Sequence, residues 1–66
     1  MKIVTLTVMI FGGSWCVKVV DNLGTRFVGA SSDRAPIVAL ALQLAQDAFL
    51  EGAVANLNLP PEMKAA

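Results

Sequence analysis

The pair Gly12-Gly13 is the feature that most limits what this chain can fold into. It follows residues 2–11, a run rich in β-branched side chains, and another such run comes directly after it. Both glycines accept the positive φ angles that a two-residue type I′ hairpin turn requires. That turn places Phe11 opposite Ser14 and so fixes every later pair. In this register the large apolar side chains collect on one face, which means that turn chemistry and hydrophobic pattern agree.

A second hairpin turn is predicted at Asn22-Leu23-Gly24, as a three-residue loop with glycine in the left-handed position. This loop places Val19 opposite Phe27 and turns Arg26 outward, near Lys18. The predicted core face of the three-stranded antiparallel meander is then Val4, Leu6, Val8, Ile10, Trp15, Val17, Val19 and Phe27. The opposite face would carry Ile3, Thr5, Thr7, Met9, Phe11, Cys16, Val20 and Val28.

Residues 31–54 predict one long helix with small side chains along the centre of its apolar face. The small residues are Ala41, Ala45, Ala48 and Gly52, and larger ones flank them, with Ile37 and Leu44 on one side and Val38, Leu42 and Phe49 on the other. Ser31-Ser32-Asp33 offers N-cap chemistry, Pro36 is tolerated in the first turn, and the helix is expected to run to about Ala55.

The sequence therefore predicts an α+β fold, a three-stranded antiparallel β-meander followed by one long helix packed on one sheet face (β-β-β-α). We expect a single domain over residues 1–59 and a C-terminal tail at 60–66. The apolar start of the chain also resembles a short signal peptide. Thr5 and Thr7 give it a strand-like alternation instead, and we favour a first strand. No run reaches the roughly 18 apolar residues of a membrane-spanning helix, so we expect no membrane partner.

The composition favours a partner subunit. The chain has 66 residues, 56% of them hydrophobic and 15% charged, with a mean hydropathy of +0.67. A core this small needs a disulfide, a metal or a second subunit to stabilise it. Cys16 is the one cysteine and there is no histidine, so the first two are disfavoured. We expect a homodimer.

The residues offer little for catalysis. Cys16 has no histidine to activate it, and we interpret it as a small buried hydrophobe. Asp47 and Glu51 share a helix face, but two carboxylates give few ligands for a cation. Gly12-Gly13-Ser14 lies between two strands, where it lacks the helix N-terminus of a phosphate site. We therefore expect no enzyme, no cofactor and no metal site.

The uncovered sheet face is the best candidate for function, because an exposed half-apolar surface usually marks an interaction site. We predict a protein–protein interaction module with a protein partner that the sequence does not identify. Its predicted contact residues are Thr5, Thr7, Met9, Lys18 and Arg26 on the sheet with Leu40 and Leu50 on the helix. The alternative is a small nucleic-acid-binding module that uses Lys2, Lys18 and Arg26. The formal net charge of zero disfavours it.

Several segments resemble one known group of domains. They are the run 15–20 (WCVKVV), the turn at 22–24, the segments 30–32 and 35–37, and the Ala-rich helix to Ala48. Over about half of the chain, they are similar to the small phage-encoded domains sometimes called "ABA sandwich" proteins. Those domains often have a charged residue after the Ala-Pro step, which residues 37–39 lack. The resemblance implies a small phage accessory protein that acts by binding in the cytoplasm of a host cell. Small phage proteins of this size are often stoichiometric inhibitors of host defences, anti-CRISPR proteins among them.

Overall fold

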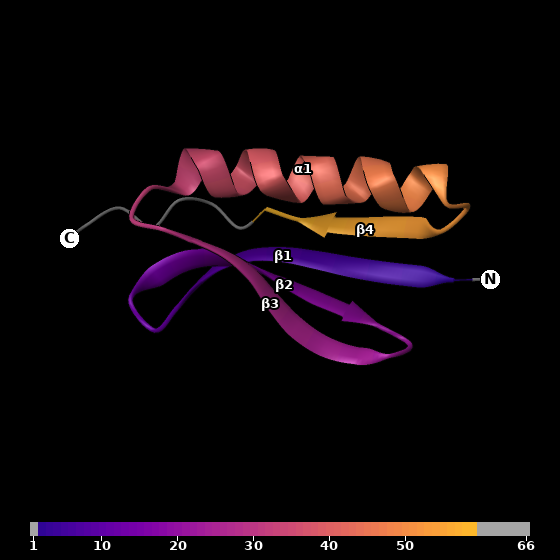
Figure 1. Cartoon of the computed structure of the whole chain (residues 1–66), viewed down its shortest axis with the longest axis horizontal. Helices are drawn as coiled ribbons and strands as arrows, with labels where there is room; N and C mark the ends of the chain where they lie inside the picture. Colours follow the sequence, from indigo (N-terminus) through magenta and orange to yellow (C-terminus); the bar gives the residue numbers. More distant parts are fainter. Residues whose placement is uncertain (1, 60–66) are drawn as a thin grey trace.

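The fold is a four-stranded mixed sheet with one helix on one of its faces (Figure 1). The computed structural model describes residues 2–59. In chain order the elements are β1 (Ile3–Phe11), β2 (Ser14–Asp21), β3 (Gly24–Ser31), α1 (Arg34–Leu50) and β4 (Val54–Asn58). The predicted α+β class is confirmed, with three consecutive strands followed by a helix that packs on the sheet. The predicted tail at 60–66 lies outside the described residues.

The first hairpin has the predicted register. Phe11 pairs with Ser14, and the following pairs run without a break to Thr5 and Val20. Gly12 and Gly13 have φ angles of 63° and 84°, as a type I′ turn requires. The strand interpretation of residues 3–11 is therefore confirmed, and the turn positions every side chain of β1 and β2 relative to the helix.

The second hairpin differs from the prediction by one residue. Asp21 pairs with Gly24 across a two-residue loop, so Phe27 lies opposite Lys18 and Arg26 lies opposite Val19. The loop is tighter because the Asp21 side-chain Oδ1 accepts a hydrogen bond from the Leu23 N–H at 2.8 Å. A slip of one residue reverses every side chain of a strand. Phe27 is thus on the outer face and Arg26 on the helix side, and both predictions were wrong.

A β-bulge then shifts the register of β3 again. One β2 residue, Cys16, faces two β3 residues, Gly29 and Ala30, between the pairs Val17–Val28 and Trp15–Ser31. Gly29 has a φ of 81°, and a Cβ built on it would lie 2.6 Å from Leu40 Cδ2. The bulge lets the helix side chains approach the backbone of β3. Val28 packs toward the core, not on the outer face where we expected it.

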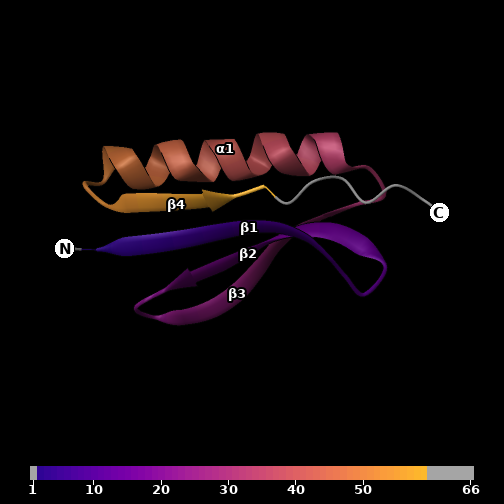
Figure 2. The same ribbon diagram turned by 180° about the vertical axis from the view of Figure 1, so that it is seen from behind.

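The helix ends earlier than predicted and is followed by a fourth strand. Residues 48–53 close the helix end, since the Gly52 N–H donates to the Phe49 carbonyl at 3.0 Å and the Ala53 N–H to the Ala48 carbonyl at 2.9 Å. This is the hydrogen-bond pattern of a Schellman motif. The chain then returns as β4, parallel to β1. Both views show α1 lying along β4 and β1 (Figures 1 and 2).

The core lies between α1 and the even-numbered side chains of β1. Its sheet residues are Val4, Leu6, Val8, Val17 and Val19, and its helix residues include Ile37, Ala41 and Ala48. Trp15 packs against this cluster from one end. Two expected members are missing, because Ile10 is exposed near the hairpin tip and Phe27 faces outward. Leu42 and Phe49 are also exposed, so of the large side chains that flank the predicted apolar stripe only Ile37, Val38 and Leu44 pack against the core.

Candidate functional site

The sheet face opposite α1 is covered by no other described element, and we call it the outer face. The strand pairings place alternate residues of all four strands on it. Its members are Ile3, Thr5, Thr7, Met9 and Phe11 from β1, Cys16, Lys18 and Val20 from β2, Thr25 and Phe27 from β3, and Val54, Asn56 and Asn58 from β4. The surface is therefore mixed, with apolar ends and a polar centre.

A pair of stacked aromatic rings stands out on the outer face. The centroids of Phe11 and Phe27 are 4.6 Å apart and the rings are within 15° of parallel. The two residues come from β1 and β3, which flank β2, so the rings meet over β2. Phe11 is 60% exposed and Phe27 44% exposed, which leaves much of this pair open to solvent. Such an exposed aromatic pair supplies large, rigid apolar contact area.

Cys16 lies under the same region of the outer face. It pairs with Met9. Along β2, it lies between the residue that pairs with Phe11 and the residue that pairs with Phe27. The residue is a free cysteine and only 4% exposed. Reaction of a thiol requires access to it, so this side chain contributes to packing beneath the aromatic pair.

Four of the predicted contact residues come together as expected. Thr5, Thr7, Met9 and Lys18 share the outer face, with Thr7 directly opposite Lys18. All four are partly buried by their neighbours. The Asn58 side-chain amide donates a hydrogen bond to the Thr7 hydroxyl at 3.3 Å, which ties β4 to β1 on this face. The polar centre is thus partly ordered by a hydrogen bond between two of its own side chains.

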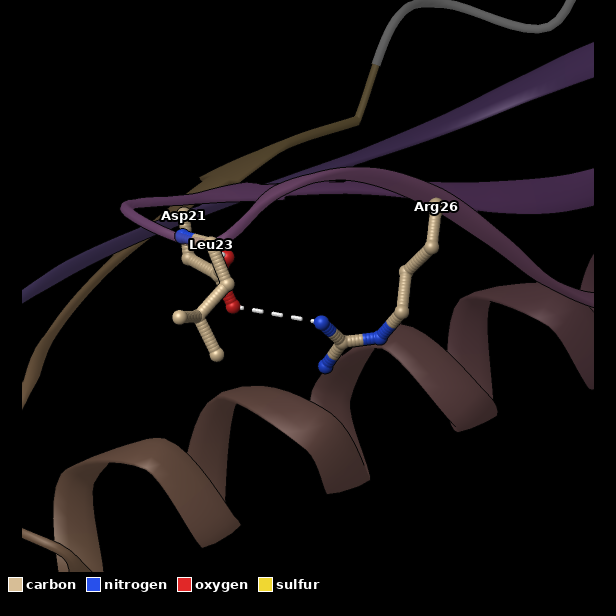
Figure 3. Close-up of polar contacts among 3 residues, drawn as sticks. All are labelled: Asp21, Leu23 and Arg26. Carbon is tan, nitrogen blue, oxygen red and sulfur yellow. Dashed lines mark hydrogen bonds and ion pairs between the residues drawn. The ribbon is translucent and has the colours of Figure 1, made fainter.

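Arg26 does not join them. Its side chain points from β3 toward the helix, where its Nη1 lies 3.2 Å from the Asp21 carboxylate (Figure 3). The Leu23 N–H and the Arg26 guanidinium together hold the pKa of the Asp21 carboxyl below its ordinary value of 3.8. Lys2 is also on the helix side. The predicted basic group is therefore divided, and of its three residues only Lys18 is on the outer face.

Lys2 and Arg26 instead line a groove between α1 and the sheet. The groove has a volume of about 230 Å³ and is open to solvent. Its acidic residues are Asp21, Asp47 and Glu51, and its floor is formed by Val4, Leu6 and Val19. Within residues 2–59, no group of three potential metal-ligating side chains is close enough to hold an ion. The groove therefore holds both acidic and basic side chains.

The two predicted helix contacts lie in different surroundings. Leu40 is partly buried against the bulge at Gly29, so it contributes to packing between α1 and β3. Leu50 is at the last turn of the helix and is 74% exposed. Neither residue adjoins the outer face, because α1 packs on the other side of the sheet.

Sequence reasoning missed Phe27, Asn56 and Asn58 as members of the outer face. Phe27 was missed because the Asx turn at Asp21 shortens the loop. The two asparagines were missed because the helix was expected to run to about Ala55 and no strand was predicted after it. Their alternation, with Ala55 and Leu57 between Val54, Asn56 and Asn58, was the available signal for a strand.

Comparison of the chain with protein-family models, with curated proteins and with solved structures finds no match. Across the part of the chain that the structure describes, no helix is long and apolar enough to cross a membrane.

Proposed function

We propose that the chain is a non-enzymatic protein–protein interaction module that binds its partner through the outer face. The observation that supports this is the stacked pair of Phe11 and Phe27, exposed on a sheet face that no described element covers. Interface centres are enriched in aromatic side chains surrounded by polar groups. Here Thr5, Thr7 and Lys18 provide the polar groups, on strands that are held together by backbone pairing.

The chemistry of the described residues favours binding over catalysis. The sequence has no histidine, and Cys16 is too covered to act as a nucleophile. The carboxylates of the groove lie among Lys2 and Arg26, where Asp21 is kept ionised and so cannot serve as a general acid near neutral pH.

A more specific form of the proposal is a stoichiometric inhibitor of a host defence protein, such as an anti-CRISPR protein, acting in the cytoplasm of the host cell. The resemblance to small phage-encoded domains supports it, as does the small size of the chain. An inhibitor of this kind needs one rigid binding face and no catalytic group, which is what the outer face offers.

The test compares capture of a host-cell partner by three proteins. They are the unmodified chain, the outer-face variant Thr7→Glu with Met9→Glu, and a control with the same added charge on the exposed side of α1, Ala39→Glu with Gln46→Glu. We expect one partner at a fixed stoichiometry, retained by the control and lost by the outer-face variant. A partner retained equally by all three would rule out the outer face.

One observation favours a second candidate, binding of single-stranded nucleic acid. Phe11, Phe27 and Lys18 combine aromatic rings and a cation on a sheet, as in proteins that stack unpaired bases. A labelled oligonucleotide at low salt should then bind, and Phe27→Ala and Lys18→Ala should each weaken binding. Absence of binding at low salt would exclude this function, since phosphate contacts are strongest there.

A further inference from the structure

The free edge of β4 carries hydrogen-bonding groups that no described residue uses. β4 is the last strand in the order β3-β2-β1-β4. The Val54 N–H donates to the Lys2 carbonyl at 2.8 Å, so the peptide groups of Val54, Asn56 and Asn58 face β1. Those of Ala55 and Leu57 must point the other way, toward the open edge. These groups can accept another strand.

β4 also lacks the features that normally keep an edge strand from pairing. Its residues, 54–58, contain no charge, no proline and no bulge. The opposite edge is different, because β3 carries Arg26 and is bent by the bulge at Gly29. Of the two sheet edges, β4 is therefore the one suited to strand addition.

The side of α1 next to β4 is apolar and exposed. Phe49 lines a shallow hollow together with residues 52–55, which places its ring beside the start of β4. Leu42 lies two helical turns before Phe49, at i−7, so it projects from the same side of the helix. Both side chains are more than half exposed, with Phe49 at 74%. A strand added to β4 would bring its own covering element against these residues.

We propose that a second copy of this chain occupies that edge, with the two β4 strands antiparallel about a two-fold axis at Asn56. Ala55 of each copy then lies opposite Leu57 of the other. Both residues have free N–H and C=O groups, so each such pair exchanges two hydrogen bonds. A small side chain faces a large one on the helix side, and the two Asn56 amides meet on the outer face.

The chemistry of the edge favours a second copy over a different protein. A two-fold contact places each residue against a neighbour from the same set, so a charged strand would repel itself. β4 and the residues Leu42 and Phe49 are all uncharged, which makes this surface compatible with itself. The dimer would also supply the additional apolar burial that a 66-residue chain without disulfides needs. The proposal of this dimer does not depend on the proposed function of the outer face.

Disulfide trapping tests the register in a Cys16→Ala background. Residues opposite each other in a non-hydrogen-bonded antiparallel pair have Cα atoms about 4.5 Å apart, within disulfide range. Under mild oxidation we expect Asn56→Cys to give a covalent dimer. Asn58→Cys is the matched control on the same strand and face, because its two copies would lie roughly 13 Å apart along the strand. Equal cross-linking at both positions would overturn the proposed register.

Solution mass tests the surface without a cysteine. By light scattering coupled to size exclusion, the unmodified chain should have twice the mass of 6.9 kDa. We expect Phe49→Glu to shift it to the monomer, because the charge would be buried against the second copy. Leu50→Glu is the control, since Leu50 is equally exposed but is not part of the hollow beside β4. A monomeric unmodified chain, or a dimer that tolerates Phe49→Glu, would overturn the proposal.

Discussion

At the scale of single residues, Asp21 influences where its neighbours in the second hairpin lie. Its carboxylate accepts the Leu23 N–H and binds Arg26 across the turn. The first bond shortens the loop to two residues, and the shorter loop sends Arg26 to the helix side and Phe27 to the outer face. One Asx turn therefore decides which of these two residues is available to a partner.

The lowered pKa of Asp21 predicts a specific dependence of stability on pH. The unfolded chain binds the proton at a higher pH than the folded chain, so the carboxylate stabilises the fold above the ordinary pKa of 3.8. This contribution should be lost as the pH falls below that value toward the lower folded pKa. In urea unfolding, Asp21→Asn should show a smaller decrease in midpoint across this window than the unmodified chain. The Asp21→Asn variant keeps an oxygen that can accept the Leu23 N–H, so it changes mainly the charge. If the midpoints of both proteins decreased equally, the pH dependence would not come from Asp21.

At the scale of elements, the bulge in β3 sets how closely α1 approaches the sheet. Gly29→Ala should destabilise the fold for two reasons, a φ of 81° and a Cβ only 2.6 Å from Leu40 Cδ2. Gly13→Ala is the matched control, because Gly13 has a φ of 84° and open space around it. We expect backbone strain to lower the free energy of unfolding of the control by about 1 kcal/mol. In Gly29→Ala, displaced packing should lower it by about 1 kcal/mol more. Equal losses in urea unfolding would show that Leu40 moves aside without cost.

The elements also show how far the sequence could predict this fold. Gly12-Gly13 defined the first hairpin completely, because a type I′ turn allows one register. The second hairpin was predicted one residue out, since Asn22-Leu23-Gly24 also suits a three-residue loop and the side-chain bond from Asp21 decides between them. The helix end at Leu50 was missed because Gly52 fitted the small-residue stripe as well as a C-terminal cap. The outer face was thus predicted for β1 and β2, and not for β3 and β4.

At the scale of the whole molecule, the edge and the outer face can act together. A two-fold axis perpendicular to the sheet leaves both helices on one side and both outer faces on the other. The dimer would present two stacked Phe11–Phe27 pairs on one continuous surface. Two linked copies of a binding face raise the apparent affinity for a partner that can contact both. Dimerisation would thus strengthen the proposed function without being required for the chemistry of either face.

Thermal unfolding provides a further test at this scale, because a dimer that unfolds to separate chains is stabilised by its own concentration. For two 66-residue chains, average unfolding enthalpies give a rise in Tm of roughly 5 °C for each tenfold increase in concentration. Phe49→Glu should remove this dependence, whereas Leu50→Glu and the outer-face variant Thr7→Glu with Met9→Glu should keep it. If the outer-face variant also lost the dependence, the two copies would associate through the sheet face, and that surface could not be free for a partner.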